Sequence, residues 1–95
     1  MKFVSETTLD RFRTPGLCEI CGKRGGREPH HVFARGMGDA WRMDIPENLL
    51  ALCRECHQAV HTGMYRRPFL LDLIGEREGL WADDLELVLT RLRWA

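Results

Sequence analysis

The stretch Cys53-Arg54-Glu55-Cys56-His57-Gln58-Ala59-Val60-His61 decides how this 95-residue chain folds, because it joins a CxxC pair directly to two histidines. A second pair, Cys18-Glu19-Ile20-Cys21, and the adjacent His30-His31 lie upstream. Together these segments hold all four cysteines and all four histidines of the chain. Thiolates and imidazoles prefer different metals, so the two residue sets suggest two metal sites with different roles.

The cysteines predict a closed structural metal site. Two CxxC knuckles that face each other build a tetrahedral four-sulfur site, which zinc fills. A chain of 95 residues lies near the size at which a hydrophobic core alone gives marginal stability, and a structural metal is a common remedy. We therefore expect one structural Zn²⁺, held by Cys18, Cys21, Cys53 and Cys56.

Other roles for the cysteines fit the sequence less well. A redox dithiol requires a strand followed by a helix around the CxxC pair, and neither pair has that setting. Cys53 to His57 matches the CxxCH motif of haem attachment, but this role would leave Cys18 and Cys21 without a function. A finger with two cysteine and two histidine ligands needs about twelve residues between Cys56 and the next ligand, whereas His57 follows directly.

The histidines predict a second metal site. His57 and His61 are spaced i, i+4, so on a helix both lie on one face and can hold one ion together. His30 and His31 are adjacent on a strand that we expect over residues 28–34, so they point to opposite sides. Only one of these two can readily join the same ion, and the other is left for a different task nearby.

The charge distribution favours an anionic ligand. The net charge is zero, but residues 1–67 hold 11 Lys/Arg against 8 Asp/Glu, whereas residues 68–95 hold 3 against 6. This basic excess coincides with the cysteines and histidines, which favours a nucleic-acid backbone over a plain solvated surface. No stretch reaches the roughly 18 apolar residues of a membrane span, and residues 1–10 lack a secretory apolar run, so we expect a cytoplasmic protein.

Local patterns predict several short elements around these motifs. We expect helices over residues 5–12, from Cys56 to about Thr62, from Pro68 to Gly79, and from Asp83 onward, with an apolar stretch over residues 49–52. We also expect Trp81 and Trp94 to fill the core. The chain is therefore predicted to be a single α+β domain over residues 1–95.

Two segments carry a resemblance to a known family. Pro29-His30-His31-Val32, followed by the run from Glu47 to His57, resembles the HNH endonuclease family, whose three letters fall on His31, Asn48 and His57. The resemblance covers about residues 17–62. It implies a small ββα-metal (His-Me finger) core, stapled by the four-cysteine zinc site and flanked by N-terminal and C-terminal helices. Residues 64–95 would form a C-terminal helical extension.

The resemblance also implies a role for each residue. His31 would be the general base, and Asn48 would orient it through its side-chain oxygen or the nearby backbone. His30, His57 and His61 would bind one divalent ion, which stabilises the departing 3′ oxygen. This ion would be Mg²⁺, Mn²⁺, Zn²⁺, Ni²⁺ or Co²⁺, and an all-histidine set tolerates Zn²⁺, Ni²⁺ or Co²⁺ better than Mg²⁺. The candidates for holding the scissile phosphate are Arg24, Arg27 and Arg35.

The predicted function is therefore a metal-dependent endonuclease that nicks or cuts duplex DNA and leaves 5′-phosphate ends. Cleavage of RNA would use the same metal chemistry. The alternative is a non-catalytic zinc module that binds nucleic acid or a protein partner on an HNH-like scaffold, although no base or ligand is missing here. In its small size, the chain resembles the free-standing HNH proteins of phages and prophages. This resemblance implies a prokaryotic or phage-infected host cell and a role in genome packaging, mobility or restriction.

Overall fold

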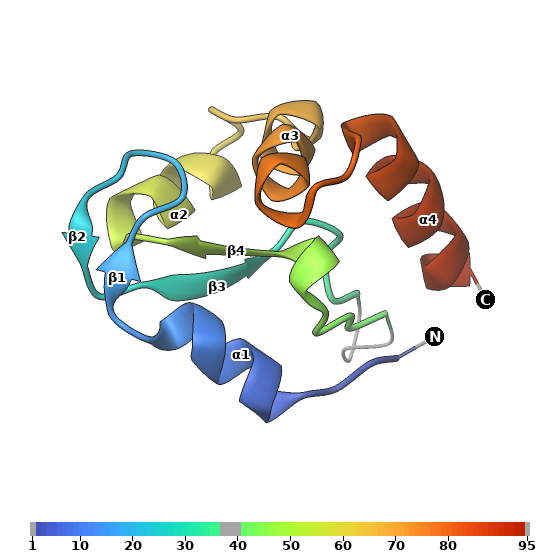
Figure 1. The fold of residues 1–95 in the computed structure, drawn as a ribbon, viewed down its shortest axis with the longest axis horizontal. Helices are drawn as coiled ribbons and strands as arrows, with labels where there is room; N and C mark the ends of the chain where they lie inside the picture. Colours follow the sequence, from blue (N-terminus) through green and yellow to red (C-terminus); the bar gives the residue numbers. More distant parts are fainter. Residues whose placement is uncertain (1, 37–40, 95) are drawn as a thin grey trace.

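A two-stranded antiparallel hairpin forms the centre of the protein. The computed structural model describes residues 2–36 and 41–94, except for the side chain of Trp94. Strand β3 (Glu28–His31) pairs with β4 (Leu49–Leu52) in a register that sets His30 opposite Leu50. Helix α1 (Glu6–Arg13) covers one face of this hairpin, and α2 (Arg54–His61) and α3 (Arg67–Glu78) lie over the other (Figure 1). The predicted α+β class with a ββα core is confirmed.

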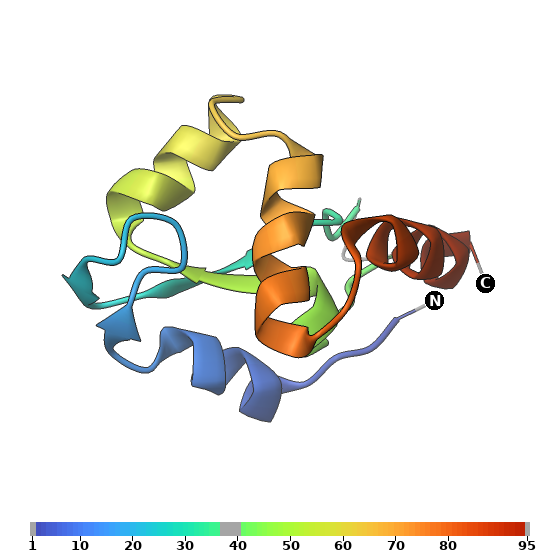
Figure 2. The same cartoon turned by 45° about the horizontal axis from the view of Figure 1, so that its top comes forward.

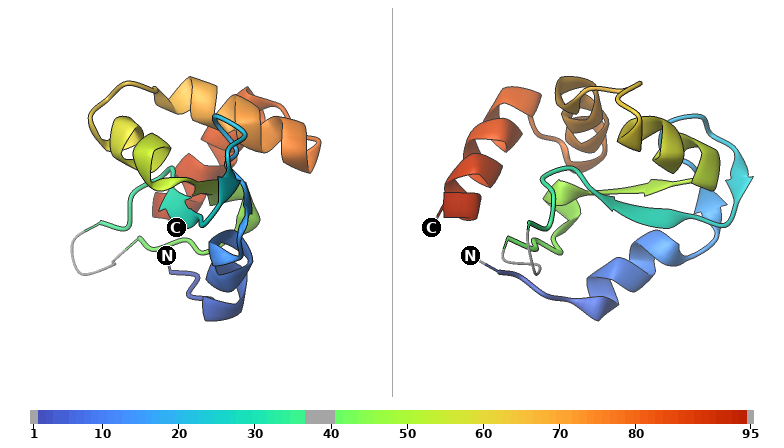
Figure 3. Two further views of the ribbon diagram at one scale, coloured as in Figure 1. Left: turned by 90° about the vertical axis from the view of Figure 1, so that its left-hand side faces the viewer. Right: turned by 180° about the vertical axis from the view of Figure 1, so that it is seen from behind.

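Strand β4 is apolar throughout because helices cover both of its faces. All four of its residues are buried, and their side chains alternate between two hydrophobic clusters. Leu49 and Ala51 pack with Leu9 and Phe12 of α1. The view from behind shows α1 and α2 on opposite sides of the hairpin (Figure 3). The continuous run Leu49–Leu52 is thus a strand buried on both faces.

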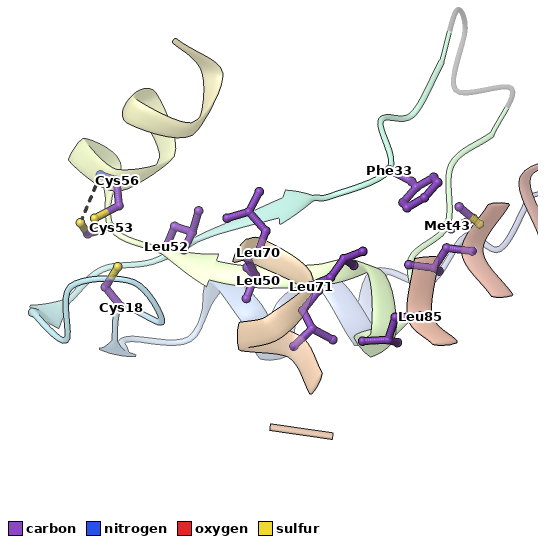
Figure 4. Packing of buried hydrophobic residues seen from close by; sticks show 12 residues of the cluster. Cys18, Phe33, Met43, Leu50, Leu52, Cys53, Cys56, Leu70, Leu71 and Leu85 are labelled. Carbon is purple, nitrogen blue, oxygen red and sulfur yellow. Dashed lines mark hydrogen bonds between the residues drawn. The ribbon is translucent and has the colours of Figure 1, made fainter. Parts of the chain in front are cut away.

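The second cluster is the larger one and lies between the hairpin, α3 and the C-terminal helix α4 (Ala82–Trp94). Figure 4 shows it extending from the cysteines at one end to Leu85 at the other. Its buried members are Cys18, Phe33, Met43, Leu50, Leu52, Cys53, Cys56, Leu70, Leu71, Ile74, Leu85 and Leu89. Three of the four cysteines therefore belong to the hydrophobic core itself.

Two short elements frame the cysteines. Strands β1 (Gly16–Leu17) and β2 (Arg24–Gly25) pair antiparallel around the first CxxC knuckle, where Gly22 has a φ of 77°. A positive φ is accessible to glycine at little cost, so the chain can turn sharply after Cys21. The 3-10 helix η2 (Pro46–Asn48) leads into β4, and Cys53 then caps the N-terminus of α2.

The predicted helices are present, but Trp81, in the turn between α3 and α4, is not in the core. Gly79 ends α3 in the left-handed conformation, with a φ of 73°. Trp81 was expected in the core, but the residue is 79% exposed, so that expectation is wrong. The reason is that Leu85 and Leu89 already anchor α4, while Trp81 precedes the helix on the outside of the turn. The side chain of Trp94 lies outside the described part.

Strand β3 is shorter than predicted. The strand expected over residues 28–34 ends at His31, because Phe33 pairs with the side chain of Asn48 instead of a neighbouring strand. Helix α4 lies beyond α3, at the end of the molecule away from β1 and β2 (Figure 2). Among the helices of residues 2–36 and 41–94, none is long and apolar enough to cross a membrane.

We predict that Gly75→Ala destabilises the protein, although alanine favours helices. A Cβ at residue 75 would lie 2.3 Å from the backbone oxygen of Leu80, where the chain folds back over α3. Overpacking of this kind costs about 1–3 kcal/mol, which exceeds the roughly 1 kcal/mol that alanine gains over glycine in a helix. Urea denaturation should show a lower free energy of unfolding than for the control Glu76→Ala on the exposed face. An equal or higher value would contradict the packing described here.

Candidate metal centres and active site

The four cysteines converge on one point. Their sulfur atoms all lie within 4.8 Å of one another, although one pair precedes β3 in the sequence and the other follows β4. Cys21 Sγ lies 3.8 Å from Cys53 Sγ, which is far longer than the roughly 2.05 Å of a disulfide bond. Cys18, Cys53 and Cys56 are buried, and Cys21 is exposed. Cys53 and Cys56 lie between strand β4 and helix α2, so the expectation that neither pair has a strand-then-helix setting is wrong. The convergence of all four sulfur atoms nevertheless favours a four-sulfur metal site over a redox pair.

The backbone and the burial act on the cysteines in opposite directions. Burial disfavours the Cys18 thiolate, but backbone hydrogen bonds such as the one from Ile20 N–H outweigh it and lower the pKa of Cys18 to about 6. Burial and the neighbouring thiols raise the pKa of Cys56. Four neighbouring sulfurs, three of them on buried residues, cannot all be anionic side by side without a cation. A bound divalent metal would remove this conflict.

Three histidines converge on a second point. His30 from β3 and His57 and His61 from α2 offer ring nitrogens within 4.8 Å of one another. The ring centroids are 5.2 Å apart for His30 and His57, 5.3 Å for His30 and His61, and 4.8 Å for His57 and His61. Burial, with the two neighbouring rings, lowers the pKa of His30 to about 4. Its ring is therefore neutral at pH 7 and offers a lone pair to a metal.

A carboxylate behind this triad fixes one of its rings. Glu28 Oε1 lies 2.8 Å from His57 Nδ1, which assigns the Nδ1 proton to this contact and leaves Nε2 for a metal. His57 Nε2 indeed faces His61 Nε2 at 3.1 Å. Glu28 was not predicted from the sequence, although its place two residues before His30 on β3 puts both residues on the same face of the strand.

His31 lies beside the triad but has a different partner. An open hollow of about 260 Å³ is lined by Pro29, Ala34, Arg35 and all four histidines. His31 Nε2 lies 2.8 Å from Asp44 Oδ1. Burial lowers the pKa of His31, and the contact with Asp44 opposes this shift without reversing it. A neutral imidazole beside three metal-binding rings can act as a proton acceptor at neutral pH.

Asp44 was not identified from the sequence. Its side chain is fully buried, and its carboxylate also accepts hydrogen bonds from Ser5 N–H and from the Arg42 guanidinium. Burial opposes its ionisation, but the hydrogen bonds from Arg42, His31 and Ser5 outweigh this effect and lower the pKa of Asp44. No motif marks residue 44, because two of its partners, Ser5 and His31, lie 39 and 13 residues away in the chain.

Asn48 is buried and contacts backbone rather than the His31 ring. Within the described residues, its Oδ1 accepts from Phe33 N–H at 2.7 Å, and its Nδ2 donates to the carbonyls of Phe33 and Met43. Its own carbonyl accepts from Val32 N–H, the residue after His31. An effect of Asn48 on His31 would therefore pass through the backbone, and this role stays a prediction.

The structure separates the three candidate arginines. Arg35 lines the hollow that holds the histidines. Arg24 lies by the cysteine knuckles, in a second hollow with Lys23 and Arg54. Arg27 donates to backbone carbonyls of residues 11, 14 and 17, and so ties α1 to β1. Of the three, Arg35 alone is placed beside the histidines.

Comparison with known proteins identifies the family. The profile of the HNH endonucleases matches residues 18–63, which include both cysteine pairs and all four histidines. This chain carries an HNH endonuclease domain. The HNH family consists of phosphodiester hydrolases and implies a nucleic-acid substrate, so the resemblance seen in the sequence is confirmed.

The chain is also similar to part of a curated yeast protein. The COX1/OXI3 intron 2 protein of Saccharomyces cerevisiae is 30% identical to the HNH chain over 78 residues, or 73% of the chain. The aligned part is only 9% of that yeast protein, so the chain spans a small fraction of its relative. No solved structure gives a significant match to the chain.

We predict that Asn48→Ala lowers the stability of the HNH domain. The change strands Phe33 N–H and two buried carbonyls, and a buried unpaired polar group costs about 1–3 kcal/mol. Chemical denaturation should therefore show a loss of about 2 kcal/mol or more. Gln58→Ala, which removes an amide from the exposed surface of α2, serves as the control. A loss no larger than that of the control would contradict the described role of Asn48.

Proposed function

We propose that this HNH chain is a metal-dependent endonuclease that hydrolyses phosphodiester bonds of duplex DNA. The observation that carries the proposal is the convergence of His30, His57 and His61 in the hollow that also contains His31 and Arg35. This set contains a metal-binding triad, a proton acceptor and a cation for the phosphate. These are the parts that metal-assisted phosphodiester hydrolysis requires.

The donor chemistry of the triad suits a catalytic metal. Three neutral imidazoles leave coordination positions open for phosphate and water, unlike the closed four-sulfur site. Nitrogen ligands favour Zn²⁺, Ni²⁺ or Co²⁺ over Mg²⁺. A divalent ion bound there would neutralise charge on the phosphate and stabilise the departing 3′ oxygen. Glu28 keeps His57 in the orientation that this binding needs.

The residues of the chain would share the remaining tasks. His31 takes the proton of the attacking water as its oxygen approaches phosphorus. Arg35 offers its guanidinium to the phosphate beside the histidines. Cleavage of the bond to the 3′ oxygen then leaves a 5′-phosphate end. Zn²⁺ on the four thiolates would stabilise the fold and leave the chemistry to the imidazoles. The boundary between the two sets of ligands falls between Cys56 and His57.

We predict that His31→Ala abolishes cleavage while the fold and both metal sites remain. Loss of a general base typically costs about 10²–10⁴ in rate. Nicking of supercoiled plasmid should be measured with Mg²⁺, Mn²⁺, Co²⁺, Ni²⁺ and Zn²⁺. A second assay should let single-stranded RNA and duplex DNA compete as substrates, to show which of the two is cleaved. Circular dichroism and metal analysis of the same protein provide the control for folding. Undiminished nicking by His31→Ala would exclude the proposed base, and wild-type protein that binds DNA but never cuts it would favour a non-catalytic module.

We predict a different outcome for Cys56→Ser. This change removes one of the four sulfur ligands, and metal binding in such sites contributes about 10 kcal/mol or more to folding. The variant should lose the tightly bound zinc and most of its cooperative thermal transition. His61→Ala, by comparison, should keep the zinc and the transition and lose only the second ion. A Cys56→Ser protein with unchanged metal content would contradict the assignment of the zinc site.

A further inference from the structure

The carboxylate of Asp44 is surrounded by hydrogen-bond donors on every side that the structure describes. Its Oδ2 accepts from Ser5 N–H at 2.9 Å and from Arg42 Nε and Nη2 at 2.8 Å each. Its Oδ1 lies 2.8 Å from His31 Nε2 and 3.0 Å from Arg42 Nε. The side chain has no exposed surface, so water does not compete for these positions.

This arrangement determines which nitrogen of His31 carries a proton. An ionised carboxylate can only accept hydrogen bonds, so a contact of 2.8 Å requires a proton on His31 Nε2. That conclusion holds for both charge states of the ring, because Nε2 is the donor in each. A neutral His31 ring then has its lone pair on Nδ1.

We propose that Asp44 is a positioning residue that holds His31 in the Nε2–H form, so that Nδ1 is the nitrogen that accepts the proton of the attacking water. The inference rests on the proposed role of His31 as the base. In this step, a water O–H bond breaks, its proton moves to Nδ1, and the oxygen forms a bond to phosphorus. The bond from phosphorus to the 3′ oxygen breaks, and that oxygen takes a proton from solvent. The imidazolium that forms donates from Nε2 to the Asp44 carboxylate, which stabilises its charge.

The carboxylate itself is held by the N-terminal segment, which lies outside the matched residues 18–63. Phe3 N–H donates to the carbonyl of Arg42, and Asp44 N–H donates to the carbonyl of Phe3. Ser5 both caps α1 and donates its N–H to Asp44. On the other side, Arg42 pairs with Glu6 of α1 at 3.0 Å. The N-terminal segment is therefore part of the support of the active site.

Asp44→Asn tests this inference because the amide has a forced orientation. Oδ2 faces three N–H donors, whereas Oδ1 faces His31 Nε2 and only the longer contact with Arg42 Nε, so the amide oxygen of Asn takes the place of Oδ2. The amide nitrogen then faces His31 Nε2 and donates to it. His31 must accept there, and its proton moves to Nδ1, which removes the lone pair from the nitrogen that attacks water. The same exchange of Asp for Asn in a serine-protease triad lowers kcat by about 10⁴ through the wrong tautomer.

We expect three results for Asp44→Asn. In ¹⁵N NMR spectra of the ring nitrogens, His31 changes from the Nε2–H form to the Nδ1–H form. The kcat for duplex DNA falls at least about 100-fold, within the range for general-base loss. KM and the number of bound metal ions stay at the wild-type values, which a merely structural defect would not produce. Asp72→Asn, the same change at an exposed position of α3, should leave all three quantities unchanged.

The inference is overturned if Asp44→Asn keeps the Nε2–H form or the wild-type kcat. It is also overturned if wild-type His31 itself shows the Nδ1–H form, a measurement that does not require the variant to fold. Wild-type protein that cleaves no nucleic acid with any metal would instead refute the proposed function. In that case, the NMR result would still decide whether Asp44 sets the tautomer.

Discussion

The fold depends on bringing four sulfur atoms of two distant CxxC pairs within 4.8 Å of one another. This constraint fixes the first knuckle against the junction between β4 and α2. Cys53 is also the N-cap residue of α2, so the direction of that helix is set at the cysteine cluster. His57 and His61 follow on the same helix, and their positions therefore depend on the sulfur site. The sulfur cluster and the histidine triad are coupled because one helix begins at the first and carries two residues of the second.

The hairpin register provides the other half of the histidine site. His30 pairs with Leu50, whose side chain belongs to the cluster under α3, whereas His31 pairs with Leu49, which packs against α1. Alternation along β3 thus directs His30 toward α2 and His31 toward the N-terminal segment that holds Asp44. A slip of one residue would exchange the two histidines and remove both the triad and the contact with Asp44. Burial of β4 on both faces makes such a slip costly.

The sequence predicts the features that are local in the chain. The i, i+4 spacing of His57 and His61, the two CxxC pairs, and the glycine at the end of α3 each act within a few residues. The contacts of Asp44 and Arg27 could not be predicted in this way, because they depend on how α1 and residues 42–44 approach the hairpin. The spacing of Glu28 and His30 indicates that both lie on one face of β3. It does not show that Glu28 meets His57, which lies on a helix 29 residues further along the chain. Trp81 was misplaced for a similar reason, since its exposure depends on which residues already fill the space under α4.

We propose that the sulfur set and the imidazole set are two separate metal sites, with the boundary between Cys56 and His57. A crystal of the zinc-loaded protein, measured for anomalous scattering at the zinc absorption edge, would locate each bound ion. We expect two peaks, one among the four cysteine sulfurs and one among the rings of His30, His57 and His61. A single ion shared by cysteine and histidine ligands, or a histidine triad that never holds metal, would contradict it.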